Sequence, residues 1–213
     1  MIAMEHQYLS ISIRIVTVAV PVGVYFLILG LLNSRRHPQV LSGRQDFALL
    51  IAAISPLFVL PLLQHMGMSL WTVAGAVAGV TGIILLLAPR GRAWVVYNLS
   101  QAEARKAISR ALLEVGVTFR ESEKGFHLAK ENCFVEVGGF APLRNVSIRL
   151  RGADKQTCGW FETALLAALS GIRTEAHPAG VSMLLVATAT LVAPFALIAH
   201  EVPEIVRLLT DLF

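Results

Sequence analysis

Side chains that could bind a soft metal flank the apolar segments of this chain. They are Met4, His6, His65, Met66, Met68 and His200. Thioether and imidazole groups are ligands that suit Cu(I) and related metals. No M-x-x-M or H-x-x-x-H spacing places two of them on one helix face, however. The pattern therefore favours amphipathic residues at a membrane interface over a metal centre.

The two cysteines, Cys133 and Cys158, are candidate zinc ligands together with His127. A structural zinc site takes four ligands and favours close C-x-x-C pairs, which this sequence lacks. Both cysteines fall in a segment that we place in the cytoplasm, where thiols stay reduced. We therefore expect free thiols, with Cys133 in the core, and no metal site.

Motifs of the common enzyme classes are absent from the sequence. It contains no Walker lysine loop, no G-x-G-x-x-G turn, no G-x-S-x-G elbow and no H-E-x-x-H helix. Gly138 and Gly139, followed by Pro142, are typical of a loop between strands. The apolar segments also carry no ionisable group of the kind that marks a proton relay. We predict a protein that is not an enzyme and needs no cofactor.

A candidate docking surface lies on one predicted strand and its neighbour. Val146, Ile148 and Leu150 alternate with more polar residues, so the intervening side chains point to the other face of the sheet. The outward set is His127, Phe134, Glu136, Ser147, Arg149 and Arg151. Phe134, Arg149 and Arg151 suit a protein partner or anionic headgroups. No RNP-like aromatic pair accompanies them, so we expect no nucleic acid. The alternative is an ordinary solvated sheet face.

The elements that position these residues begin with four charge-free stretches. They cover residues 15–32, 47–64, 69–88 and 180–199, within a chain that is 55% hydrophobic and only 15% charged. Each is about as long as a helix that crosses a hydrocarbon core of roughly 30 Å. Backbone groups in lipid must bond to one another, so such segments cross as helices. The sequence predicts about four transmembrane helices.

Basic residues near these segments predict the orientation of the chain. They are Arg35, Arg36, Arg44, Arg90 and Arg92. The connection 65–68, between the second and third segments, has no lysine or arginine. Positive residues favour the cytoplasmic side. We therefore expect both termini outside and the soluble segment in the cytoplasm, with a bacterial cytoplasmic membrane as the expected location.

A small-residue face marks the third apolar segment. Gly75 and Gly79 form a G-x-x-x-G pattern, and Gly82 extends the same face. Small residues let helix backbones approach closely in lipid. Glycine is common in membrane helices in any case, so an incidental pattern is the alternative to a helix-packing face.

The segment between the third and fourth spans predicts a compact α+β domain. Ser100 and Glu103 form a capping box for a helix that ends near Gly116. Strands are expected at 94–99, 117–120, 125–128, 133–137 and 146–150, and a second helix at 154–169. This order favours a two-layer sandwich, with a ferredoxin-like variant as one arrangement. The predicted parts are residues 1–92, the soluble domain 93–176, and 177–213 with the fourth span and an amphipathic tail helix.

The sequence favours a non-enzymatic membrane subunit, a scaffold or accessory component of a larger assembly. Its features are those of attachment: spans without polar groups, a small-residue face, an outward sheet surface and an amphipathic tail. The expected partners are the lipid bilayer and other membrane subunits or further copies of the chain. The alternative is a small homo-oligomeric transporter or channel.

Overall fold

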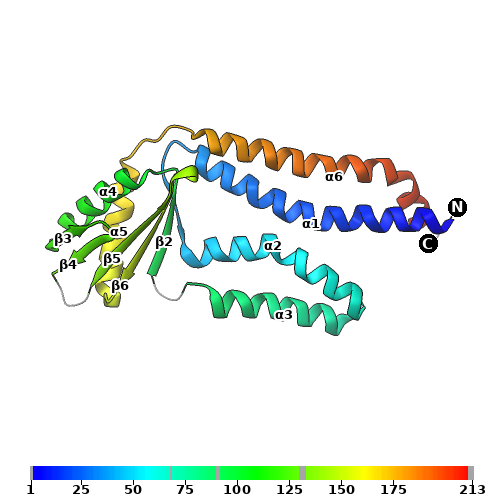
Figure 1. The fold of residues 1–213 in the computed structure, drawn as a ribbon, viewed down its shortest axis with the longest axis horizontal. Coiled ribbons are helices and arrows are strands. Elements are labelled where there is room, and N and C mark those ends of the chain that lie inside the picture. Colours follow the sequence, from blue (N-terminus) through cyan, green and yellow to red (C-terminus); the bar gives the residue numbers. More distant parts are fainter. Residues whose placement is uncertain (1, 68, 90–91, 130–132, 211–213) are drawn as a thin grey trace. The chain divides into compact units, whose positions relative to one another are not determined.

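The computed structural model describes residues 2–67, 69–89, 92–129 and 133–210. The side chains of residues 2–14, of residue 64 and of most of 195–210 fall outside this description, as does Arg90. Long helices form both ends of the chain (Figure 1). In sequence order, the strands of a sheet and two shorter helices come between the first and the last of these long helices. The contacts divide the chain into two compact units, 1–28 with 50–82 and 183–213, and 29–49 with 83–182.

The long helices are α1 (Ile2–Ser34), α2 (Gly43–Met66), α3 (Leu70–Leu87) and α6 (Pro178–Thr210). Three of them contain segments that are long and apolar enough to cross a membrane, namely Ile15–Ser34, Gly43–Leu63 and Leu70–Leu87. Their length and composition indicate a protein that is integrated in a membrane. The predicted fourth span falls within α6, whose apolar segment among the described residues, Pro178–Pro194, is shorter than the other three.

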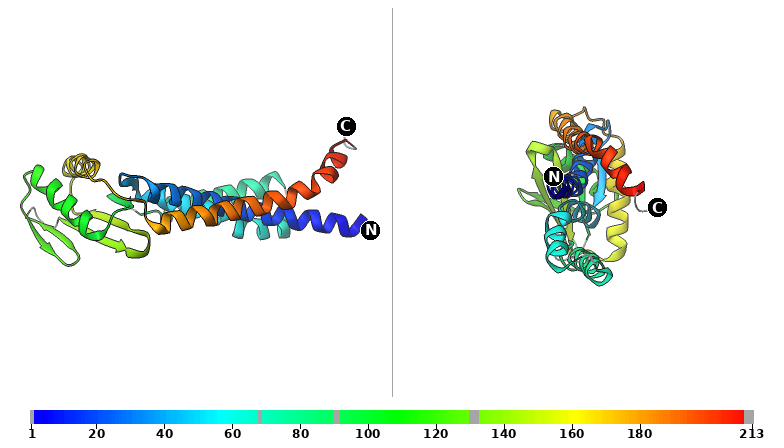
Figure 2. Two further views of the ribbon diagram at one scale, coloured as in Figure 1. Left: turned by 90° about the horizontal axis from the view of Figure 1, so that it is seen from above. Right: turned by 90° about the vertical axis from the view of Figure 1, so that its right-hand side faces the viewer.

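Helix α6 continues without interruption through the region predicted as a separate tail helix. Pro194 and Pro203 lie inside it, and its last part bends near the C-terminus in Figure 2. Proline removes a backbone donor and permits such a bend. The tail is therefore a continuation of α6, and its predicted apolar face falls on side chains outside the description.

Helices α1 and α6 pack closely through a glycine. A Cβ atom added at Gly23 would come within 2.8 Å of Leu191 Cγ and 3.5 Å of Thr190 Cγ2. Ala187 of α6 and Leu29 of α1 are also buried. Absence of a side chain at Gly23 permits this approach, as at other close contacts between membrane helices.

The second unit is built on a six-stranded sheet with strand order β1-β2-β6-β5-β4-β3. The strands are β1 (Gln39–Ser42), β2 (Arg92–Tyr97), β3 (Phe119–Ser122), β4 (Gly125–Leu128), β5 (Phe134–Phe140) and β6 (Asn145–Arg151). Every neighbouring pair is antiparallel. A ferredoxin-like fold has the chain order β-α-β-β-α-β. Among the described elements β3, β4, β5 and β6 instead follow one another without an α-helix between them, and no strand follows α5, so the chain order differs from that variant. The α+β class is confirmed.

Strand β1 adds a feature that the predicted soluble domain 93–176 does not contain. It lies in the connection between α1 and α2 and pairs with β2, Val40 opposite Val96. Four residues are too few to show a clear alternation in sequence, and this connection was interpreted only through its arginines. The sheet therefore takes its edge strand from between two apolar helices.

Helices α4 (Gln101–Glu114) and α5 (Lys155–Ser170) cover one face of this sheet (Figure 2). Their apolar sides and the inward strand residues form one core, which includes Ile108, Phe126, Val135, Ile148 and Leu165, each at most 1% exposed. Burial of side chains of this size stabilises a fold by about 1.5–3 kcal/mol each. The predicted strand alternation and both predicted helices are confirmed.

The β3–β4 hairpin depends on glycine at its turn. Gly125 has φ +150°, and a Cβ atom there would lie 1.9 Å from the Val135 carbonyl oxygen. No L side chain fits so close to a backbone atom. The strands expected at 117–120 and 125–128 are confirmed and pair as this hairpin, and its sharp turn requires Gly125.

Candidate functional site

The structure brings the three predicted docking residues together on the outer face of the sheet, opposite α4 and α5. Phe134 on β5 is directly opposite Arg151 on β6, and Glu136 is opposite Arg149. The side chains of Arg149 and Arg151 are 51% and 58% exposed. We call Phe134, Glu136, Arg149 and Arg151 the β5–β6 patch.

One carboxylate serves both arginines of the β5–β6 patch. Glu136 Oε2 lies 2.7 Å from Arg151 Nη2 and 3.9 Å from Arg149 Nη1. Exposed ion pairs of this kind contribute about 0–1 kcal/mol to stability. The pairs therefore hold the arginines side by side without neutralising both of them.

An aromatic pair borders the β5–β6 patch. The rings of His127 and Phe134 are opposite one another on β4 and β5, with centroids 4.5 Å apart. Phe134 is only half-buried, and His127 is exposed. The patch thus combines an apolar ring with two guanidinium groups, which is the composition that recurs at energetically important points of protein interfaces.

A buried polar cluster, which the sequence analysis missed, lies in the same compact unit, where β2 ends. Asn98 follows β2, is 0% exposed and has φ +57°. Its side-chain amide donates to the Arg35 carbonyl at 2.9 Å, to Thr174 Oγ1 at 3.0 Å and to the Glu175 carbonyl at 3.1 Å. Its backbone N–H donates to Asn33 Oδ1 at 3.2 Å. We call Asn33, Arg35, Asn98, Thr174 and Glu175 the Asn98 cluster.

The Asn98 cluster joins three separate parts of the chain. Asn33 and Arg35 belong to the end of α1 and the residues after it, and Thr174 and Glu175 to the connection between α5 and α6. The Thr174 N–H donates to the Arg36 carbonyl at 2.8 Å, which strengthens the same junction. Buried polar groups need such partners because an unpaired one costs about 1–3 kcal/mol. The cluster therefore fixes the sheet to the ends of two long helices.

A second polar link fastens the start of α2 to the sheet. The Tyr97 hydroxyl donates to Asp46 Oδ1. Tyr97 is the last residue of β2, and Asp46 lies in the first turn of α2. Gly43 packs nearby, where an added Cβ would lie 3.0 Å from Ala93 Cβ. The connection from β1 to α2 is thus held by contacts of Gly43 and Asp46 with residues of β2.

The predicted capping box of α4 is confirmed. Ser100 Oγ accepts from the Glu103 N–H, and the Glu103 carboxylate accepts from the Ser100 N–H and hydroxyl. Arg144 Nη2 lies 3.0 Å from Glu103 Oε2. The hydrogen bonds from Ser100 lower the pKa of Glu103, and Arg144 adds to the effect. This carboxylate is explained by capping and needs no catalytic role.

The small-residue face of α3 has no partner within the described part of the chain. A Cβ atom added at Gly75, Gly79 or Gly82 would meet no heavy atom within 4 Å. Close approaches between helices are instead found at Gly23, next to Leu191, and at Gly180, next to Asn33 and Ser34, neither of which the sequence analysis singled out. Packing through the α3 face stays a prediction, and it needs a second chain or another protein.

The candidate metal ligands do not assemble among the residues that the structure describes. No group of three or more His, Cys, Asp or Glu side chains suitable for a metal is found in that part of the chain. Cys133 and Cys158 are both buried and form no disulfide, so the predicted core position of Cys133 is confirmed. His65 and Met66 are exposed. Met68 and the side chains of Met4, His6 and His200 lie outside the described residues.

Comparison of the chain with models of protein families, with curated proteins and with solved structures found no match. The class of protein therefore follows from its own sequence and structure. It is a membrane-integrated chain with long apolar helices and an antiparallel α+β unit.

Proposed function

We propose that this protein is a non-enzymatic scaffold or accessory subunit of a membrane assembly, and that its β5–β6 patch docks a partner subunit. The observation that carries the proposal is the exposed patch itself, with Phe134 beside two arginines that a single carboxylate orients. The rest of the second unit would hold the β5–β6 patch in a fixed position. Its core packs against the inner face of the sheet, and the Asn98 cluster joins the sheet to the helix ends. A partner with acidic and apolar groups would complement this surface.

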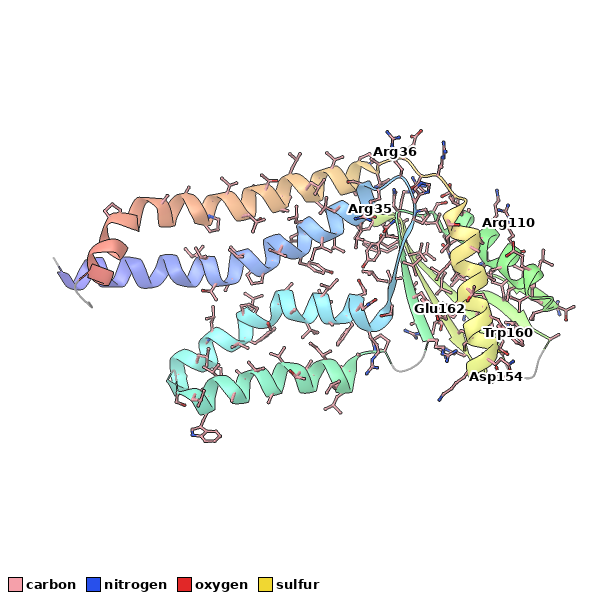
Figure 3. All side chains as sticks on the ribbon, turned by 180° about the vertical axis from the view of Figure 1, so that it is seen from behind. Arg35, Arg36, Arg110, Asp154, Trp160 and Glu162 are labelled. Carbon is pink, nitrogen blue, oxygen red and sulfur yellow. The ribbon has the colours of Figure 1, made fainter. Side chains whose placement is uncertain are left out.

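Exposed apolar residues elsewhere on the same unit agree with attachment. Trp160 on α5 is 56% exposed and Phe140 at the end of β5 is 57% exposed. Trp160 and Glu162 both lie on α5, where Figure 3 labels them. Large aromatic side chains in such positions are enriched at interfaces.

The orientation within the membrane is part of the proposal. Four spans place both termini outside and the sheet in the cytoplasm, because Arg35, Arg36, Arg44 and Arg92 then face the cytoplasm. Cysteines introduced at Gln39 and at Lys106 test it with a thiol reagent that does not cross membranes. Neither is expected to react in intact cells, and both are expected to react after permeabilisation. Modification of either one in intact cells would exclude this topology.

The docking proposal is tested with the double variant Arg149→Ser/Arg151→Ser in the full-length protein. We expect recovery of a co-purifying subunit to fall at least about ten-fold, because paired, partly desolvated charges at interfaces are worth more than exposed ones. The melting midpoint should stay nearly constant, since surface substitutions change stability by about 0.5 kcal/mol or less. Quantitative mass spectrometry of the purified protein provides the first readout and a thermal melt the second.

The matched control is Lys106→Ser/Arg110→Ser, which removes two exposed cations from α4. Figure 3 shows Arg110 on that helix, well separated from Asp154. Partner recovery should be unaffected in the control. Equal recovery from both double variants would exclude the β5–β6 patch as the docking surface.

A homo-oligomeric transporter or channel is the second candidate. It is favoured by one observation, the α3 glycine face that has no partner within the described residues. Pro56 and Pro61 inside α2 would permit kinks along a path next to it. The state of assembly of an α3 variant, described in the Discussion, separates the two candidates.

A further inference from the structure

Four cationic residues border one end of the sheet, where it follows α3. Arg92 begins β2, Arg149 and Arg151 lie within the last three residues of β6, and Lys155 begins α5. They are close together because β2 and β6 are antiparallel. Arg92 is opposite Leu150 and so lies on the sheet face that α5 covers, whereas Arg149 and Arg151 lie on the other face. Together they line a depression of about 750 Å³.

The lining of this depression is suited to an anion. Its residues are Pro89, Arg92, Arg149, Leu150, Arg151, Gly152, Ala153, Lys155 and Cys158, with no carboxylate among them. Arg92 Nη1 donates to the Lys155 carbonyl at 3.0 Å, which orients its guanidinium across the start of α5. Guanidinium and ammonium groups are the side chains that bind phosphate oxygens best.

Two carboxylates lie near the depression, and neither neutralises it. Glu136 pairs with Arg151 and, at longer range, with Arg149. Asp154 lies at the N-cap of α5, and its Oδ1 accepts from the Thr157 N–H at 2.7 Å. Neither Arg92 nor Lys155 has an ion pair with a carboxylate among the described residues. An excess of positive charge therefore remains.

The chain itself keeps this depression close to the end of an apolar helix. Pro89 follows Leu87, the last residue of α3, by two positions, and so lies within about 7 Å of it. Arg92 is within about 18 Å by the same limit. The headgroup layer of each leaflet is roughly 5–8 Å thick. The last residues of α3 also belong to the same compact unit as the depression.

We propose that this depression binds the phosphate-bearing headgroup of an anionic membrane lipid. Basic groups close to the end of a span are attracted to anionic lipids, and Pro89, Leu150 and Ala153 supply apolar surface for the part of the lipid below its phosphate. Free phosphate shares the same chemistry, but the position next to α3 favours the lipid. The depression shares Arg149 and Arg151 with the β5–β6 patch, whereas Arg92 and Lys155 lie outside the patch, so substitution of these two residues tests lipid binding separately from partner docking.

The test uses the purified full-length protein in a neutral detergent and native mass spectrometry with added phosphatidylglycerol. Phosphatidylcholine is the neutral comparison, and inorganic phosphate is the headgroup-free comparison. Arg92→Gln/Lys155→Gln is expected to weaken phosphatidylglycerol binding roughly thirty-fold, which is about 2 kcal/mol for two basic groups. Lys106→Gln/Arg110→Gln removes the same charge from α4 and should leave binding within about two-fold of the original, since exposed charges interact weakly at a distance.

Glu136→Gln provides a change of opposite sign. It removes the carboxylate that competes for Arg151, so phosphatidylglycerol should bind more tightly to this variant. This test does not require Arg92→Gln/Lys155→Gln to fold. The proposal is overturned if Arg92→Gln/Lys155→Gln folds and binds phosphatidylglycerol as before, or if Glu136→Gln does not tighten binding. It is also overturned if phosphatidylcholine binds as tightly as phosphatidylglycerol. The same holds if inorganic phosphate binds as tightly as phosphatidylglycerol. Partner recovery is a separate measurement, so failure here leaves the docking proposal intact.

Discussion

Asn98→Gly is expected to destabilise the full-length protein by about 2–3 kcal/mol, and Asn98→Ala by about 1 kcal/mol more. Glycine keeps the φ of +57° without strain but loses the amide whose two hydrogens are shared among three oxygen atoms. The Arg35 carbonyl still accepts from the Thr174 hydroxyl, so the main loss falls on Thr174 Oγ1 and the Glu175 carbonyl. Each buried acceptor left without a partner costs about 1–3 kcal/mol. Alanine loses the same bonds and also takes on a left-handed backbone that costs roughly 1–2 kcal/mol.

Asn98→Asp is expected to be the most damaging of the three substitutions. It has the same shape as asparagine, but its carboxylate would face the oxygen atoms of Arg35, Thr174 and Glu175 with no hydrogen to donate. A buried charge without a partner is among the few changes that cost more than about 4 kcal/mol. We expect little folded protein of this variant.

The measurement is the thermal melt of the three variants in one detergent, with Thr174→Ser as the matched control. Thr174→Ser retains the hydroxyl that accepts from Asn98, so it should melt close to the original protein. The expected order of melting midpoints is original, Gly, Ala, Asp. If Asn98→Gly melts with the original protein, the Asn98 cluster does not hold the sheet to the helix ends.

The Asn98 cluster is an example of contacts that could not be predicted from the sequence. The hydrogen bonds of Asn98 reach residues 63–77 positions away, and no local spacing reports such pairs. By contrast, the Ser100–Glu103 capping box and the alternation of Val146, Ile148 and Leu150 are local patterns, and both were found in the sequence. Local periodicity fixes an element and its buried face, whereas partners distant in sequence appear only in the fold.

The same distinction holds for the candidate site. Strand alternation predicted that Arg149 and Arg151 share one face of the sheet. The position of Glu136 beside both arginines depends on the register of β5 with β6, which the sequence does not report. Arg92 was interpreted as a topology signal only, because its place next to Lys155 depends on β2 lying beside β6. The basic depression could therefore not be predicted from any one segment.

The second prediction concerns two glycines in the apolar helices, at which the same substitution is expected to have different effects. Gly23→Leu is expected to destabilise the protein by about 1–3 kcal/mol, because its Cβ would lie 2.8 Å from Leu191 Cγ and the helices must separate. Gly79→Leu should leave the melting midpoint of the single chain unchanged, since its Cβ meets no atom within 4 Å. It should instead disrupt assembly through α3, where closely approaching backbones need a small residue.

Analytical ultracentrifugation and a thermal melt in the same detergent separate the two effects. Val77→Leu is the control, because Val77 lies on α3 two positions from Gly79 and points away from the glycine face. Loss of a homo-oligomer in Gly79→Leu alone would support the transporter or channel candidate. Loss of a different co-purifying subunit would support the scaffold. An unchanged assembly with Gly79→Leu would show that the α3 glycines are incidental, and the β5–β6 patch would then remain as the proposed contact with a partner.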